Sequence, residues 1–138
     1  MKNKTVVIIR GVSGSGKSTF AETVKAHTQG NAVICTADDY FHQNGEYRFD
    51  PTKLGKAHGY CFRKFCKAIE ENKPLVIQNN TNSNPKEFQK YVDFAEEKGY
   101  IVFSIVMENR HGNSNVHGVP NETVERQYNN LITSLLLK

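Results

Sequence analysis

A glycine-rich segment near the start of the chain constrains its fold more than any other feature. Residues 11–18 read Gly-Val-Ser-Gly-Ser-Gly-Lys-Ser and fit the pattern G-x-x-x-x-G-K-[ST]. A β-branched apolar run, Thr5 to Ile9, precedes the segment, and a helical pattern follows it. Strand, glycine loop and helix in this order predict a loop that wraps a phosphate chain, a P-loop, with backbone N–H groups and the helix N-terminus facing the anion.

The residues of this segment have separate expected roles. Lys17 is expected to reach the β- and γ-phosphates of a nucleoside triphosphate, with ATP as the expected nucleotide, and Ser18 to offer its hydroxyl to Mg²⁺. Glycine permits the tight turn and the close approach of the backbone to the phosphate oxygens. The predicted nucleotide-binding residues are Gly11, Ser13, Gly14, Ser15, Gly16, Lys17, Ser18 and Thr19.

The size and composition of the chain fit one small domain spanning residues 1–138. Its formal net charge of +4 permits a polyanionic partner without requiring one. The chain has no run of about 18 apolar residues, and its first residues lead into a strand without a signal-peptide core, so we expect a cytoplasmic protein that does not enter a membrane. The three cysteines lack zinc-type spacing and are expected to be small buried side chains.

Apolar runs alternate with helical patterns along the chain. Strands are expected at 4–10, 32–36, 75–78 and 100–107, and helices at 17–29, 51–72, 84–98 and from 120 onward. This alternation predicts an α/β, three-layer P-loop NTPase fold with a short parallel sheet of about four strands flanked by helices. Ligands of such sheets bind at the carboxyl ends of the strands, so the loops after the strands are the expected site.

Two adjacent carboxylates, Asp38 and Asp39, follow the second expected strand. One of them, taken to be Asp38, is expected to point into the site, where it would accept the proton of an attacking hydroxyl and help to hold Mg²⁺. Asp39 is expected to cap the following turn. The alternative, in which both are turn and cap residues, remains open.

Amides follow the third expected strand, where many P-loop enzymes place a carboxylate. Asn79 or Asn80 can hydrogen-bond a water or a phosphate but brings no charge, so Mg²⁺ is expected to depend on Ser18, on the phosphates and on Asp38. The alternative is an asparagine- and serine-rich turn that caps the next helix.

The segment after the fourth expected strand, residues 109–119, is polar and rich in glycine and asparagine. Such a loop is expected to close as a lid over the nucleotide and exclude water. Arg110 is the predicted cation for the moving phosphoryl group, and Arg126 on the final helix is the reserve candidate.

The helix expected from Pro51 carries a basic side. Helical spacing places Lys56, Tyr60, Arg63, Lys64 and Lys67 together. Such a stripe could follow a phosphate backbone, and a solvated lysine face is the simpler interpretation.

The order of these motifs resembles that of polynucleotide 5′-kinases and the small P-loop kinase-like ATPases related to them. The resemblance rests on the glycine loop, Asp38-Asp39-Tyr40, Asn80-Thr81-Asn82 and the C-terminal lid, and it covers nearly the whole chain. It implies an ATP- and Mg²⁺-dependent kinase in which Asp38 activates the acceptor hydroxyl, Lys17 and Ser18 hold ATP and Mg²⁺, and a lid arginine contacts the phosphates.

The chain departs from this pattern at three places. Phe41 stands where polynucleotide kinases carry an arginine, Asn79-Asn80 stand where these families place an aspartate, and Ser114 stands at the usual lid arginine, which leaves Arg110. The expected function is a kinase that phosphorylates a polynucleotide 5′-hydroxyl or a small molecule. The alternative is a nucleotide-dependent binding or regulatory module with weak ATPase activity.

Overall fold

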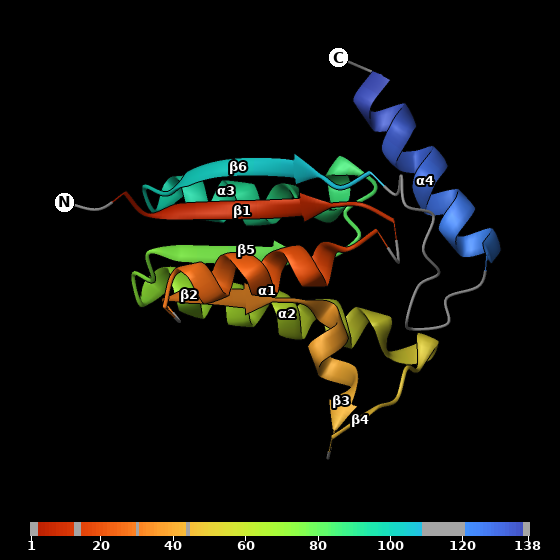
Figure 1. Cartoon of the computed structure of the whole chain (residues 1–138), viewed down its shortest axis with the longest axis horizontal. Coiled ribbons are helices and arrows are strands. Elements are labelled where there is room, and N and C mark those ends of the chain that lie inside the picture. Colours follow the sequence, from red (N-terminus) through yellow and green to blue (C-terminus); the bar gives the residue numbers. More distant parts are fainter. Residues whose placement is uncertain (1–2, 13–14, 30, 44, 109–120, 137–138) are drawn as a thin grey trace.

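A four-stranded parallel sheet forms the centre of the computed structural model, which describes residues 3–12, 15–29, 31–43, 45–108 and 121–136. All four strands run in the same direction, so their carboxyl ends share one edge of the sheet, on the right in Figure 1. This architecture confirms the predicted α/β fold. In spatial order the strands are β2 (Ala32–Cys35), β5 (Leu75–Asn79), β1 (Thr5–Arg10) and β6 (Ile101–Val106).

Helices cover the two faces of the sheet and give three layers (Figure 1). Successive side chains of a strand point to opposite faces, so the apolar run of β1 serves both. Val6 and Ile8 pack toward α2 (Leu54–Glu70) and α3 (Gln89–Glu97), whereas Ile9 packs toward α1 (Lys17–His27). The two resulting cores bury Ile8 and Ile9 on opposite faces, directly before the point where the glycine loop leaves β1.

The segment between β2 and α2 is more ordered than the loop that its polar sequence suggests. It contains a 3₁₀ helix, η1 (Ala37–Phe41), a hairpin of β3 (His42–Gln43) and β4 (Glu46–Tyr47), and a second 3₁₀ turn, η2 (Pro51–Lys53). Strands of two residues are too short to produce an alternating pattern, which is why the sequence gives no signal for them. The hairpin extends below the carboxyl edge of the sheet in Figure 1.

The last described helix, α4 (Asn121–Leu136), lies against the carboxyl end of the sheet (Figure 1). The Arg10 guanidinium at the end of β1 donates a hydrogen bond of 2.7 Å from Nη2 to Ser134 Oγ, and Leu131 is buried. Among the described residues, none of the helices has the length and apolarity needed to cross a bilayer.

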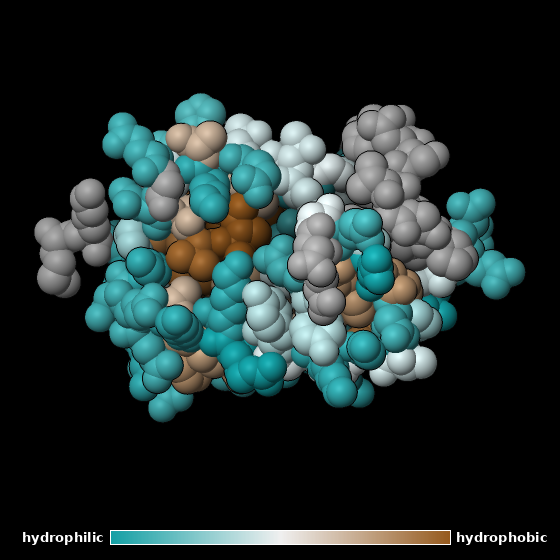
Figure 2. Space-filling view, turned by 90° about the horizontal axis from the view of Figure 1, so that it is seen from below, coloured by the Kyte–Doolittle hydropathy of each residue, from teal (hydrophilic) through white to brown (hydrophobic). Residues whose placement is uncertain are grey.

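The two edge strands of the sheet are β2 and β6. The side that carries β2 faces the viewer in Figure 2, where an apolar region remains visible between hydrophilic side chains. The hairpin and the first turn of α2 lie on this same side, next to the carboxyl edge.

Candidate functional site

The glycine loop begins in a crowded position at the end of β1. The backbone N–H of Gly11 donates to the Thr81 carbonyl oxygen at 3.0 Å. A Cβ added to Gly11 would lie 2.7 Å from Ser15 Oγ and 3.0 Å from the carbonyl oxygen of Met107, so only glycine fits here. At the other end of the loop, Gly16 precedes α1 with φ of 94°, a left-handed conformation that glycine adopts without steric cost. The predicted residues Ser13 and Gly14 lie outside the described residues.

Replacement of Gly11 by alanine is expected to lower the free energy of unfolding by about 1–3 kcal/mol, because the new methyl group overpacks the site. Chemical denaturation monitored by circular dichroism measures the change. Gly55→Ala is the matched control, because a Cβ at Gly55 meets no atom within 4 Å. Equal stability of the two variants would contradict the close approach at Gly11.

The Lys17 side chain lies folded back on its own loop. Its Nζ donates to the Val12 carbonyl oxygen at 3.1 Å. Burial lowers the pKa of the Lys17 ammonium to about 8, and the nearby Asp38 carboxylate opposes this shift. A buried ammonium whose charge is only partly compensated is a strong site for an anion, which would restore the stability of its charged form.

The first turn of α1 fits a hydrated Mg²⁺. Ser18 and Thr19 are exposed there, and Asn79 at the end of β5 places its Nδ2 atom 3.4 Å from Ser18 Oγ. Asn79 is only 6% exposed, and its Oδ1 atom has no hydrogen-bond partner among the described residues. The Asn79 amide group therefore lies next to the place where an ion at Ser18 would hold its water shell. The described residues contain no group of three or more His, Cys, Asp or Glu side chains suited to a metal, so phosphate and water oxygens would complete the coordination.

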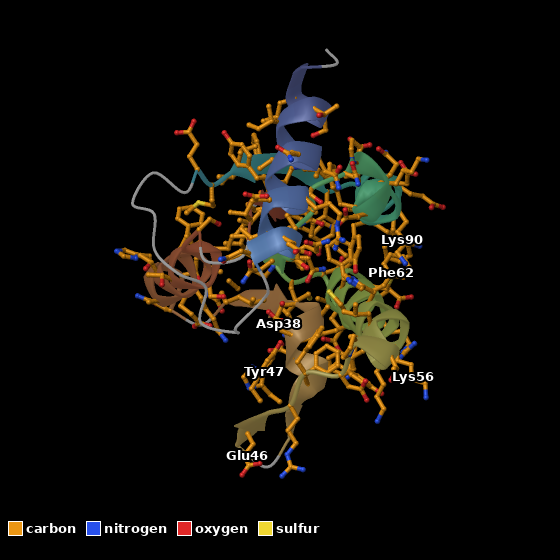
Figure 3. All side chains as sticks on the ribbon, turned by 90° about the vertical axis from the view of Figure 1, so that its right-hand side faces the viewer. Asp38, Glu46, Tyr47, Lys56, Phe62 and Lys90 are labelled. Carbon is orange, nitrogen blue, oxygen red and sulfur yellow. The ribbon has the colours of Figure 1, made fainter. Side chains whose placement is uncertain are left out.

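The two carboxylates of η1 have different surroundings. Asp39 forms an ion pair with Lys64 of α2, with 3.4 Å between Oδ2 and Nζ. Asp38 accepts a hydrogen bond of 3.5 Å from the Tyr47 hydroxyl and interacts electrostatically with Lys17. Figure 3 looks onto the carboxyl edge, with Asp38 near its centre and Tyr47 on the hairpin below it.

Tyr47 was not singled out from the sequence. Burial, together with the adjacent Asp38 carboxylate, raises the pKa of Tyr47 to about 12. Its hydroxyl therefore keeps its proton at neutral pH and acts as the hydrogen-bond donor to Asp38. The two-residue strands of the hairpin bring this tyrosine to the carboxylate, and their shortness explains why the sequence does not reveal it.

A cavity of about 330 Å³ lies between the first turn of α1, the end of β5 and η1. It places the exposed hydroxyl of Ser18, the amide of Asn79 and the carboxylate of Asp38 around one space. Its polar wall is mixed in charge, with three carboxylates and two lysines. The lining residues are Ser18, Glu22, Lys25, Ile34, Thr36, Asp38, Asp39, His42, Lys64 and Asn79.

A buried network of neutral amides fixes the backbone beside this cavity. Asn80 Oδ1 accepts from the backbone N–H of Ala37 at 2.8 Å, which ties the β5 end to the start of η1. Asn82, fully buried with φ of 50°, donates to the Ile9 carbonyl oxygen at 2.7 Å and to Gln78 Oε1 at 2.6 Å. Asn80 is thereby occupied in holding η1, and Asn79 is the amide that faces the cavity.

Arg10 is a second residue that sequence reasoning missed. Its guanidinium is buried, donates from Nε to the Asn82 carbonyl oxygen at 2.9 Å, and lies 4.8 Å from the Phe88 ring centroid. Burial lowers its pKa, and the Glu87 carboxylate opposes the shift. A charged residue at the end of an otherwise apolar strand was the one available signal. The predicted lid residue Arg110 lies outside the described residues.

The comparisons with known proteins agree with this arrangement. The family model of an AAA domain (AAA_33) matches residues 6–114, which include β1, the glycine loop, η1 and the β5 end. The chain belongs to the AAA domain family.

Relatives of this AAA domain occur within longer proteins. Human NEDD4-binding protein 2 is 33% identical over 128 residues, which are 88% of this chain and 7% of that protein. A protein of Autographa californica nuclear polyhedrosis virus, named as a bifunctional polynucleotide kinase/RNA ligase, is 24% identical over 143 residues, covering 91% of this chain and 20% of its own length. The AAA domain therefore corresponds to a small part of these relatives.

A solved structure shares the fold of the AAA domain. A chain of the Pnkp1/Rnl/Hen1 RNA repair complex superposes with a TM-score of 0.74 at 20% identity, covering 100% of this chain and 47% of its own length.

Proposed function

We propose that this domain is an ATP-dependent kinase that transfers the γ-phosphoryl group of ATP to a hydroxyl acceptor, either a polynucleotide 5′-hydroxyl or a small molecule. The observation that carries the proposal is the joint position of Lys17, Ser18 and Asp38. A buried ammonium, an exposed hydroxyl and a carboxylate converge on one edge of the sheet, and Ser18 and Asp38 line one cavity. Relatives named as a polynucleotide kinase and as part of an RNA repair complex support this choice of reaction.

Each residue has a defined task in the proposed reaction. Lys17 leaves its hydrogen bond to the Val12 carbonyl oxygen and holds the phosphate chain. The Ser18 hydroxyl, with the Asn79 amide beside it, would hold a hydrated Mg²⁺ that neutralises phosphate charge. Asp38, oriented by Tyr47, accepts the proton of the acceptor hydroxyl. ATP supplies the phosphoryl group: the acceptor oxygen bonds to the γ-phosphorus, the bond to the β,γ-bridging oxygen breaks, and ADP leaves. Arg110 is proposed from sequence alone as the lid cation.

A second candidate function is a nucleotide-dependent binding module with little turnover. The neutral amide of Asn79 favours it, because no carboxylate from β5 supports the metal. Tight ATP binding without product, and a partner retained only in the ATP-bound state, would distinguish this module from a kinase.

The test of the proposal incubates the purified domain with γ-labelled ATP and Mg²⁺. The acceptors are single-stranded DNA and RNA with 5′-hydroxyl ends, nucleosides and small alcohols, and labelled product is separated from phosphate. Labelled acceptor is expected from at least one class, and Lys17→Ala protein is the background control. Release of phosphate alone, with no labelled acceptor in any class, would reject the kinase.

The Asn79→Asp variant is expected to lower the Mg²⁺ concentration needed for nucleotide binding by on the order of tenfold. The new carboxylate would attract Mg²⁺ through a water. This attraction is weaker than the roughly 4 kcal/mol between two unit charges about 4 Å apart in a dielectric of 20. Calorimetric titration of ADP at several Mg²⁺ concentrations measures the shift without requiring turnover.

The apo form of the same variant is expected to melt at a lower temperature, because the new carboxylate is buried and uncompensated, and Mg²⁺ with nucleotide should restore it. Asn79→Ala is the matched control and is expected to need more Mg²⁺ than the wild type. An unchanged Mg²⁺ requirement in both variants would remove Asn79 from the metal site.

A further inference from the structure

The α2 helix carries a continuous basic face beside the candidate site. Its members recur at helical spacing and lie on one side of the helix, over roughly 20 Å from the end of η2. At the C-terminal end of α2 this basic face is followed by two acidic residues, Glu70 and Glu71. The basic α2 face consists of Lys53, Lys56, Tyr60, Arg63, Lys64 and Lys67.

One member of this face reaches the cavity that Asp38 lines. Lys64 lines the same cavity and reaches Asp39, and the Tyr60 ring lies 5.9 Å from the ring of Tyr40 in η1. Figure 3 shows Lys56 projecting outward from the side of α2 that lies away from Asp38. A long ligand could therefore keep one end at the carboxylate while it extends along the helix.

The outer cations of the face are not neutralised by neighbouring acids. Within the described part of the chain, Lys56, Arg63 and Lys67 form no ion pair, and all three are exposed. Of the three carboxylates that line the cavity, Asp39 is already paired with Lys64. A row of exposed, uncompensated cations attracts an extended polyanion.

Exposed apolar groups accompany these cations. Tyr60 is 37% exposed, and at the start of α2 Phe49 and Leu54 are 50% and 40% exposed. The centroid of the Phe49 ring lies 5.2 Å from that of buried Phe41. Phe49 therefore packs against the core on one side and remains accessible to solvent on the other. Aromatic rings beside a basic row are the combination that binds unpaired bases and their phosphates together, whereas a polyphosphate or an acidic peptide has no base to stack.

We propose that the basic α2 face binds single-stranded nucleic acid, with bases against Tyr60 and Phe49, phosphates along Lys56, Arg63 and Lys67, and the strand end at Asp38. This assignment rests on the proposed function, because it names the acceptor of that same site.

The first test reverses charge on the outer part of the face. Fluorescence anisotropy of a labelled 5′-hydroxyl oligothymidylate gives the dissociation constant of the wild type, of Lys56→Glu with Arg63→Glu, and of the control Lys73→Glu with Lys98→Glu. Both double variants change the net charge equally. Binding by the α2 variant is expected to weaken by about tenfold or more. The negative slope of log K against log salt is expected to become less steep by roughly 1.4, the value for two lost phosphate contacts. The control is expected to match the wild type.

The second test addresses stacking. Tyr60→Leu keeps an apolar side chain against Tyr40 but removes the ring, and is expected to weaken oligothymidylate binding by about fivefold or more. Equal losses in the two double variants, tighter binding of duplex than of single strand, or equal binding of polyglutamate would each overturn the proposal.

The two proposals fail in different ways. Phosphorylation of a small alcohol, combined with oligothymidylate binding that is identical in the wild type and the α2 variant, would reject the surface and keep the kinase. Absence of any labelled acceptor, combined with oligothymidylate binding that depends on the α2 face, would reject the kinase and keep the surface.

Discussion

The Lys17→Ala variant is expected to bind ATP about a hundredfold to a thousandfold more weakly than the wild type. A unit charge about 4 Å from a phosphate oxygen is worth roughly 4 kcal/mol at an effective dielectric of 20, and the alanine removes that charge. Isothermal titration calorimetry with Mg²⁺ measures both affinities. The control is Lys73→Ala, an exposed lysine in the turn before β5, at the opposite edge of the sheet. Equal ATP affinity in the two variants would contradict the assignment of the glycine loop.

The low pKa of Lys17 adds a pH dependence to this result. Without nucleotide the pKa is about 8, and a bound phosphate chain stabilises the charged form and raises it. ATP affinity is therefore expected to fall above about pH 8, by up to about tenfold per pH unit, with proton uptake on binding. Calorimetry in buffers of different ionisation enthalpy measures the uptake, and the Lys17→Ala variant should lose it.

The same group affects folding with a definite sign. Its folded pKa lies below the ordinary value of 10.5, so between about pH 8 and 10.5 the unfolded chain binds more protons. The contribution of Lys17 to the free energy of unfolding therefore rises with pH across that window. Bound ATP, by raising the pKa, should flatten this rise.

The Asp38→Asn variant is expected to lower kcat by about a hundredfold to ten-thousandfold, the usual range for loss of a positioned general base. ATP binding should survive, because Lys17 and Ser18 remain. Turnover with the accepted hydroxyl compound and calorimetric ATP affinity are measured on the same preparation.

Asp39→Asn is the matched control for this substitution. It makes the same chemical change one residue away, at a carboxylate that pairs with Lys64. Its effect on kcat is expected to be much smaller. A variant at Asp38 that binds ATP and turns over at the wild-type rate, or a larger loss at Asp39, would remove Asp38 from the role of base.

The layered fold and the glycine loop could be predicted from the sequence because both depend on short-range patterns. The residue types themselves indicate the local structure: the apolar run of β1 indicates a buried strand, and the glycines at 11 and 16 indicate a tight turn. The parallel sheet follows from the alternation of strands and helices. The order of the strands, with β5 between β2 and β1, depends on contacts between distant segments and leaves no such local record.

The surroundings of the candidate base were not predictable in the same way. Tyr47 reaches Asp38 through a hairpin with two-residue strands, and Arg10 reaches Ser134 across most of the chain length. The sequence does not indicate which of Asn79 and Asn80 faces the nucleotide site. Tertiary contacts decide this, because Asn80 accepts a hydrogen bond from the Ala37 backbone and Asn79 faces Ser18. Such pairings arise from packing of segments far apart in the chain.

The buried amide side chains that join β1, β5 and η1 affect the stability of the fold in acid. Gln78, Asn80 and Asn82 join these elements through amide groups, which gain or lose no proton between acidic and alkaline solution. Acidification should therefore leave these contacts, and with them the attachment of η1 to β5, intact. Hydrogen exchange at low pH would then show that the Ala37 amide of η1, which donates to Asn80, stays protected together with the amides at the end of β5.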